Sequence, residues 1–100
     1  MELQVQIHTN DIEHTKEVIE RIVSENLKNK LDSYLKKFDS KQDAEGNVDL
    51  KVEKNKSDRF NGTLQVNLDG QAYHYHREDY KNLDDLINHL FDHLKEDLSK

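Results

Sequence analysis

The chain has 100 residues, of which 33% are hydrophobic and 36% are charged, and this composition predicts one domain with a small core under a highly charged surface. The absence of cysteine excludes disulfides, thiolate metal sites and thiol nucleophiles, and it fits a cytoplasmic protein. The formal net charge of −6 disfavours nonspecific nucleic-acid binding, unless basic residues gather locally on the surface.

The first part of the chain is predicted to form a strand and then a long helix. Leu3, Val5 and Ile7 alternate with polar residues, which is typical of a half-buried strand. From Ile12 to Phe38, apolar residues recur at spacings of three and four. That pattern predicts an amphipathic helix of roughly seven turns at ~3.6 residues each.

Three more strands are predicted after a polar loop. Apolar and polar residues alternate in segments 48–52, 64–68 and 71–75. Asp69-Gly70 is a strong two-residue hairpin signal, because a type I′ turn needs positive φ at both central positions. Such a turn places three pairs opposite each other, and both tyrosines on the helix-covered face: Leu68 with Gln71, Val66 with Tyr73, and Leu64 with Tyr75.

The final segment, Asp79–Leu98, is predicted to form a second amphipathic helix. Its apolar residues fall on one stripe: Tyr80, Leu83, Leu86, Ile87, Leu90, Leu94 and Leu98. The predicted fold class is therefore α+β with the order β-α-β-β-β-α. A four-stranded sheet would have both helices packed on one face, and residues 1–100 would form a single domain.

The segment Glu78–Leu94, EDYKNLDDLINHLFDHL, carries a more specific resemblance. It resembles the second helix of the ribosome hibernation-promoting factors, also called the ribosomal subunit interface, sigma-54 modulation or S30EA family. The matching features are Tyr80 after an acidic residue, the Leu83-Asp84 pair and the Leu86-Ile87 pair. The opening strand, the Ile12 entry to the first helix and the 61–75 hairpin also fit the short form of the family.

The resemblance implies a cytoplasmic, ribosome-associated protein that binds rRNA of the small subunit near the decoding channel. There it would block mRNA and tRNA, and so regulate translation by promoting ribosome hibernation under stress. The sequence departs from the family where basic residues are common. His89, Asp92 and His93 occupy such positions in the second helix, and Asn26 occupies one in the first.

The net-positive part of the chain, residues 28–59, supplies the candidate rRNA-binding residues. Nine basic residues there exceed seven acidic ones. The predicted patch comprises Lys28, Lys30, Lys36 and Lys37 at the end of the first helix, with Lys54, Lys56 and Arg59 in the loop before the third strand. These residues would contact phosphates with salt-dependent affinity. The alternative is a solvated lysine surface, with helix C-terminal lysines favoured by the helix dipole.

Other groups of residues favour no further chemistry. His89 and His93 have helical metal-ligand spacing but lack a convincing third ligand. His74 and His76 would lie on the open face of the sheet, and could join His8 if the first and last strands were close. Tyr73 and Tyr75 could stack on bases, but the hairpin register favours core packing.

We therefore expect no enzymatic activity, no cofactor, no metal, no small-molecule substrate and no membrane association. No apolar run approaches the ~20 residues that span a bilayer, and no signal-peptide pattern opens the chain. A second hypothesis keeps the fold but replaces rRNA binding with a protein–protein contact. In that case the acidic second helix or the open sheet face would meet a basic partner or a second copy. The sequence leaves the oligomeric state open.

Overall fold

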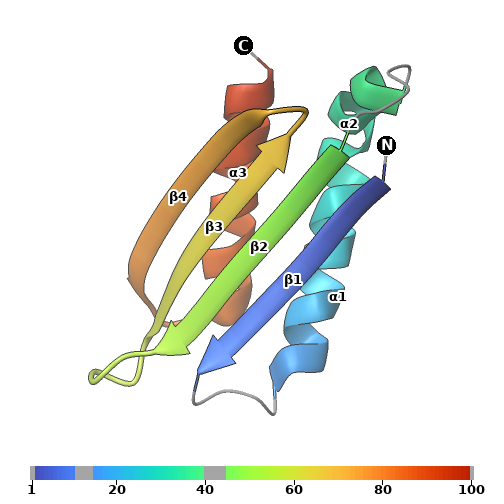
Figure 1. Ribbon diagram of the computed structural model, residues 1–100. Coiled ribbons are helices and arrows are strands. Elements are labelled where there is room, and N and C mark those ends of the chain that lie inside the picture. The colour runs from blue at the N-terminus through green and yellow to red at the C-terminus, as the bar shows by residue number, and fades with distance from the viewer. Residues whose placement is uncertain (1, 11–14, 40–44, 100) are drawn as a thin grey trace.

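The computed structural model describes residues 2–10, 15–39 and 45–99, without the side chains of residues 2, 35, 37–39 and 45. In chain order the elements are β1 (Glu2–Asn10), α1 (Lys16–Asn26), the π-helical turn η2 (Leu27–Leu31), α2 (Asp32–Asp39), β2 (Glu45–Lys54), β3 (Phe60–Leu68), β4 (Gln71–Tyr80) and α3 (Leu83–Leu98). The strands form one sheet with the helices on one face (Figure 1). The predicted α+β class and its β-α-β-β-β-α order are confirmed.

The sheet is mixed, with the strand order β1-β2-β3-β4. β1 pairs with β2 in parallel, whereas the β2–β3 and β3–β4 pairs are antiparallel. A parallel pair needs a crossover connection, and the helical segment from α1 to α2 provides it by running back along the sheet (Figure 1). The start of α1 therefore lies near the end of β2, and α2 lies near the start of β2.

The hairpin between β3 and β4 has the predicted turn and register. Asp69 and Gly70 have φ values of 49° and 87°, as a type I′ turn requires. Leu68 pairs with Gln71, Val66 with Tyr73 and Leu64 with Tyr75. Both tyrosines face the helices as predicted, since Tyr75 is buried in the core and Tyr73 packs against it.

The core lies between the sheet and the helices. α3 contributes five side chains that are at most 1% exposed: Leu86, Ile87, Leu90, Phe91 and Leu94. They meet the inward residues of β2 and β3, among which Leu50, Val52 and Leu64 are fully buried. A Cβ added at Gly62 on β3 would lie 3.0 Å from the Leu86 Cδ2 and 3.2 Å from the Leu90 Cδ1. The glycine thus permits the close approach of α3 to β3.

The first helical segment is continuous from Lys16 to Asp39, but it changes its hydrogen bonding at η2. Ile12, where the sequence predicts this helix to begin, lies outside the described residues. The Asn26 side chain, which is 3% exposed, donates a 2.8 Å hydrogen bond to the carbonyl of Ile22 immediately before the π-turn. Side chains that bond to nearby backbone in this way compete with regular helical bonding.

The prediction that the last helix begins at Asp79 is wrong, because α3 begins at Leu83. Tyr80 instead ends β4, where it pairs with Phe60 of β3 and packs against the core from the sheet. Asp79 has a φ of 61°, and its amide donates a 3.0 Å hydrogen bond to the Asn61 Oδ1. Tyr80, which faces the core from the end of a strand, thus has by chance the spacing of the apolar stripe of α3, and the predicted helix began too early.

The close packing at Gly62 predicts a specific sensitivity. Gly62→Val should destabilise the protein by about 1–3 kcal/mol, because the added carbons overpack the space held by Leu86 and Leu90. Ala72→Val, at an exposed position of β4, adds the same type of side chain without meeting a helix. It should change the free energy of unfolding by no more than about 0.5 kcal/mol. Urea unfolding of both variants would measure this, and equal effects would contradict the role given to Gly62.

Candidate nucleic-acid interface

The structure separates the seven predicted rRNA-binding residues into two groups. Lys28, Lys30, Lys36 and Lys37 lie in η2 and α2 and are called here the helical lysine group. Lys54, Lys56 and Arg59 lie in and beside the β2–β3 loop and are called the loop group. α2, which carries Lys36 and Lys37, and the β2–β3 loop lie at opposite ends of a molecule that is 45 Å long, whereas η2, which carries Lys28 and Lys30, lies in the middle of the helical segment (Figure 1). The residues that the sequence analysis assigned to one patch therefore form two separate groups, and the binding role of each residue stays a prediction.

Ion pairs reduce the free positive charge of the helical lysine group to different extents. Lys28 is exposed and forms no ion pair within the described part of the chain. Lys36 Nζ lies 3.2 Å from the Asp32 carboxylate, and both side chains are well exposed. Lys30 Nζ lies 2.7 Å from the Asp92 Oδ1, and its side chain is only 28% exposed. Of the three lysines in this group whose side chains are described, Lys28 and Lys36 are thus the most available cations, and Lys30 is partly neutralised by α3.

The loop group is held on an ordered turn. The Asn55 Oδ1 accepts hydrogen bonds from the amides of Ser57 and Arg59, and its Nδ2 donates to Asp79 at 2.6 Å. Lys54 Nζ lies 2.9 Å from the exposed Asp58 carboxylate. An exposed pair of this kind contributes little stability, so a phosphate could displace the aspartate.

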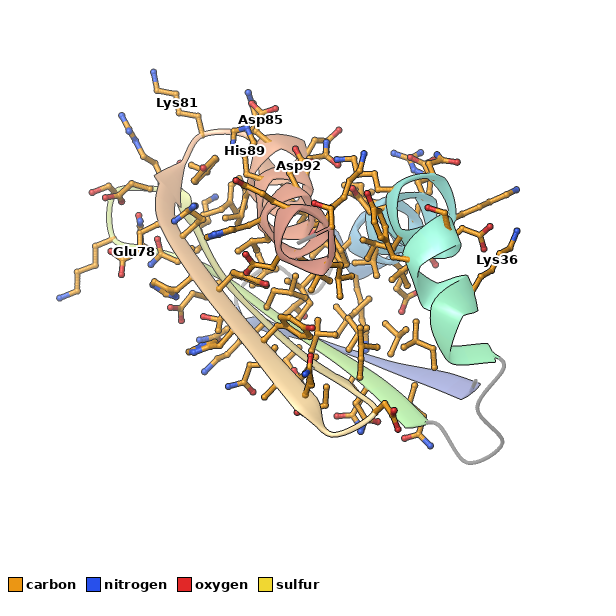
Figure 2. All side chains as sticks on the ribbon, turned by 90° about the horizontal axis from the view of Figure 1, so that it is seen from above. Lys36, Glu78, Lys81, Asp85, His89 and Asp92 are labelled. Carbon is orange, nitrogen blue, oxygen red and sulfur yellow. The ribbon has the colours of Figure 1, made fainter. Side chains whose placement is uncertain are left out.

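The outward face of α3 is acidic. Between Leu83 and Leu98 there are five acidic residues and one lysine. Asp85, His89 and Asp92 project from α3 away from the sheet, while Lys36 projects from α2, further from α3 (Figure 2). The helical lysine group therefore lies beside an acidic helix face.

A partly buried polar contact joins the two long helical segments next to the helical lysine group. Asn26 Nδ2 donates a 2.8 Å hydrogen bond to the Asn88 Oδ1 of α3, and the Asn26 Oδ1 is buried without a partner among the described residues. Together with the Lys30–Asp92 pair, this contact fixes the position of η2 against α3. Sequence reasoning missed it, although Asn26 falls on the apolar stripe between Val23 and Leu27, where a polar residue is unusual.

His89 and His93 are engaged with neighbouring side chains. The His89 Nδ1 lies 2.9 Å from the Tyr80 hydroxyl, and the His93 ring lies 4.6 Å from the Tyr75 ring. The described residues contain no group of three or more His, Asp or Glu that could hold a metal. His8 lies on β1 and His76 lies on β4, at opposite edges of the sheet, so the possible joining of these histidines does not occur.

Tyr75 is a core residue with a polar end, and Tyr73 lies beside it at the edge of the same core. The Tyr75 hydroxyl donates a 2.7 Å hydrogen bond to the Asp97 Oδ2 near the end of α3. Burial first, and then the hydrogen bond and negative charge of Asp97, raise the pKa of the Tyr75 hydroxyl well above its ordinary value. The tyrosines therefore serve packing, and a base-stacking platform is not formed.

Comparison with solved structures finds a domain of similar fold, whereas comparison of sequences finds no match. No protein-family model matches the chain, and no curated protein sequence matches it. A crystal structure of the Thermus thermophilus Protein Y N-terminal domain is similar, with a TM-score of 0.72 and 22% sequence identity. The similarity covers 98% of this chain and 96% of that one. No helix in the described ranges is long and apolar enough to cross a membrane.

The raised pKa of Tyr75 predicts a pH-dependent stability. At pH 8, Tyr75→Phe should lower the free energy of unfolding by about 1–2 kcal/mol, through loss of the bond to Asp97. The unfolded tyrosine ionises near pH 10, whereas the folded one stays protonated, so this stabilisation is complete below about pH 10 and declines above it. The difference in free energy of unfolding between the wild type and Tyr75→Phe should therefore decrease above about pH 10, as measured by denaturant unfolding.

Tyr73→Phe is the matched control for this measurement. The Tyr73 hydroxyl donates to Gln71 in an exposed hydrogen bond, so its loss should change stability by at most about 0.5 kcal/mol. A gap between wild type and Tyr75→Phe that stays constant to pH 11 would contradict the role assigned to the Tyr75–Asp97 bond.

Proposed function

We propose that this chain is a ribosome-associated protein that binds rRNA of the small subunit and inhibits translation by promoting hibernation. The observation that carries the proposal is the fold, which is the one that the sequence resemblance to the hibernation-promoting factors implies. It is shared with the Protein Y N-terminal domain over nearly the full length of both chains. The resemblance in the sequence lies mainly in the segment that forms the end of β4 and α3.

The helical lysine group supplies the principal phosphate contact in this proposal. Residues 27–37 contain four lysines and one aspartate, so positive charge is dense there despite the net charge of −6. Phosphate contacts by lysine release counterions and give affinity that falls steeply with salt. The exposed Lys36–Asp32 pair would yield to a phosphate at little cost, because surface ion pairs contribute at most about 1 kcal/mol.

The loop group supplies a second contact at the other end of the molecule. Its backbone is preorganised by the Asn55 hydrogen bonds, so binding would order few additional groups. Two basic groups separated along a rigid body would fix the orientation of the protein on an rRNA surface, because phosphate contacts set position and register. In this account the open sheet face and the outward face of α3 do not contact rRNA.

The acidic outward face of α3 favours a second candidate function, a protein–protein interaction module of the same fold. Asp85 and Asp92 project from this face (Figure 2), and Asp92 neutralises the nearby Lys30. Such a face repels phosphate and suits a basic protein partner. The two functions differ in their target and in which surface of the chain makes the contact.

Charge reversal tests the helical lysine group directly. The double variant Lys28→Glu, Lys36→Glu should weaken co-sedimentation with ribosomes at least ~10-fold, and should reduce the slope of log affinity against log salt by about two. The control Lys51→Glu, Lys95→Glu makes the same change in net charge at exposed lysines on β2 and α3. Equal losses in both double variants would indicate a general charge effect. Unchanged binding in the first would contradict this contact.

Removal of the Asp92 charge tests the same surface by an expected gain of ribosome affinity. Asp92→Asn should release Lys30 for phosphate contact and raise ribosome affinity several-fold, with a change in stability below about 1 kcal/mol. Asp85→Asn removes the same charge from the same helix without freeing a lysine, so it controls for net charge. A matched gain in both variants, or no gain in Asp92→Asn, would show that Lys30 is not part of the contact surface.

A further inference from the structure

A recess lined by none of the candidate phosphate-binding residues lies between α1 and β1. This β1–α1 groove has a volume of about 670 Å³. Val5 and Ile7 of β1, together with Val23 and Leu27 of the helical segment, form its apolar lining. None of the seven candidate phosphate-binding residues lines it.

The groove exists because the helices do not fully cover the sheet at β1. Val5 points to the same side of the sheet as its neighbour Val48, which is only 2% exposed. Val5 nevertheless remains 41% exposed. In Figure 1, β1 forms the edge of the sheet, so one side of its backbone has no neighbouring strand among the described residues.

The β1 edge lacks the features that usually prevent strand addition. In natural proteins, proline, lysine, bulges or short length prevent an edge strand from pairing with a strand of another chain. β1 has nine residues, and its pairing with β2 runs without interruption from Glu2 to Asn10. Residues 3–10 contain no proline and no Asp, Glu, Lys or Arg. The edge can therefore accept an additional strand.

The sequence of β1 is self-complementary about Val5. Leu3-Gln4-Val5-Gln6-Ile7 has the same order of apolar and amide side chains in both directions. Antiparallel pairing of two copies centred on Val5 places Val5 opposite Val5 of the second copy, and Leu3 opposite Ile7 of the second copy. These side chains share the groove side of the sheet, while Gln4 meets Gln6 of the second copy on the open face. Such a pattern fits a two-fold interface, in which each residue pair occurs twice.

We propose that the β1 edge binds a second copy of this chain, antiparallel and centred on Val5, to form a continuous eight-stranded sheet. The two β1–α1 grooves would meet across the two-fold axis and cover both exposed Val5 side chains. The proposal concerns a surface that the rRNA proposal does not use and stands independently of it.

Charge supports a second copy as the occupant. The groove is lined by one base and one acid, Lys16 and Glu20, so neither copy presents a net charge there, with histidine counted as neutral. Residues 3–10 add no formal charge. Repulsion between two chains of net charge −6 therefore comes from more distant surfaces and is screened by salt. Self-association should strengthen as salt rises, opposite to phosphate binding.

A cross-linking experiment tests the register. The natural chain has no cysteine, so Val5→Cys introduces a single thiol. Directly opposed residues of an antiparallel pair have Cα atoms about 4.5–5.5 Å apart, within the range of a disulfide. Mild oxidation of Val5→Cys should therefore give a covalent dimer. In the Thr9→Cys control the two thiols lie about 26 Å apart in this register, eight residues at ~3.3 Å each, and should not cross-link. Equal cross-linking in both variants would overturn the register.

Sedimentation of the cysteine-free chain tests the interface itself. The wild-type protein should show a concentration-dependent dimer between about 1 μM and about 1 mM, as for a small, weak interface. Val5→Lys should abolish the dimer by placing two lysines opposite each other. Val18→Lys is the matched control, because Val18 is 39% exposed on α1 and lies outside the groove. It should dimerise as the wild type does.

Two results would overturn the proposal. If the wild-type protein stays monomeric throughout that range, the β1 edge does not bind a second copy. An extended segment of another protein would then be the occupant of the edge. A dimer that persists in Val5→Lys would place self-association on another surface. Thermal melting of Val5→Lys provides a check on folding, since an exposed edge substitution should leave the unfolding transition cooperative.

Discussion

The apolar face of the four-stranded sheet has to be covered by only two long helical segments, and this constraint shapes the rest of the molecule. α3 lies close against β3, which Gly62 permits, and it buries five large side chains there. The inward residues of β2 and β3 are thereby excluded from water. β1, at the edge of the sheet, receives less cover, as the exposed Val5 shows. The core and the β1–α1 groove thus have one cause, because the helices cover β2 and β3 more fully than they cover β1.

The same helix arrangement determines the electrostatics. The π-turn η2 lies against α3, so the basic end of the first helical segment adjoins an acidic helix. The Asn26–Asn88 hydrogen bond and the Lys30–Asp92 ion pair hold this junction. Within the helical lysine group, Lys28 and Lys36 therefore keep a more available positive charge than Lys30. A protein with a net charge of −6 can bind phosphate only if such local separation of charge is maintained on its surface.

Much of the fold could be predicted from the sequence, because local signals agreed with the global arrangement. Asp69-Gly70 determined the hairpin and its register, and the register placed Tyr73 and Tyr75 beneath the helices. The start of α3 could not be located from periodicity alone, because Tyr80 contributes to the core from the end of a strand. Its apolar side chain matches a helical stripe that begins three residues later, at Leu83.

The candidate site was less predictable, since a count of charges along the chain does not show which end of the fold each residue occupies. The parallel pairing of β1 and β2 requires the intervening helix to run antiparallel to both strands. Lys36, near its end, must then lie far from Lys56, in the loop that follows β2. The buried Asn26 contact depends on the angle and distance between two helices, which no local pattern specifies.

Ribosome association can be measured by sedimentation of the wild-type chain with isolated small and large ribosomal subunits. The measurement would be made at low salt and at near-physiological salt. We expect stoichiometric binding to the small subunit that weakens steeply as salt rises, with little binding to the large subunit. No binding to the small subunit at low salt, or equal binding to both subunits, would contradict it.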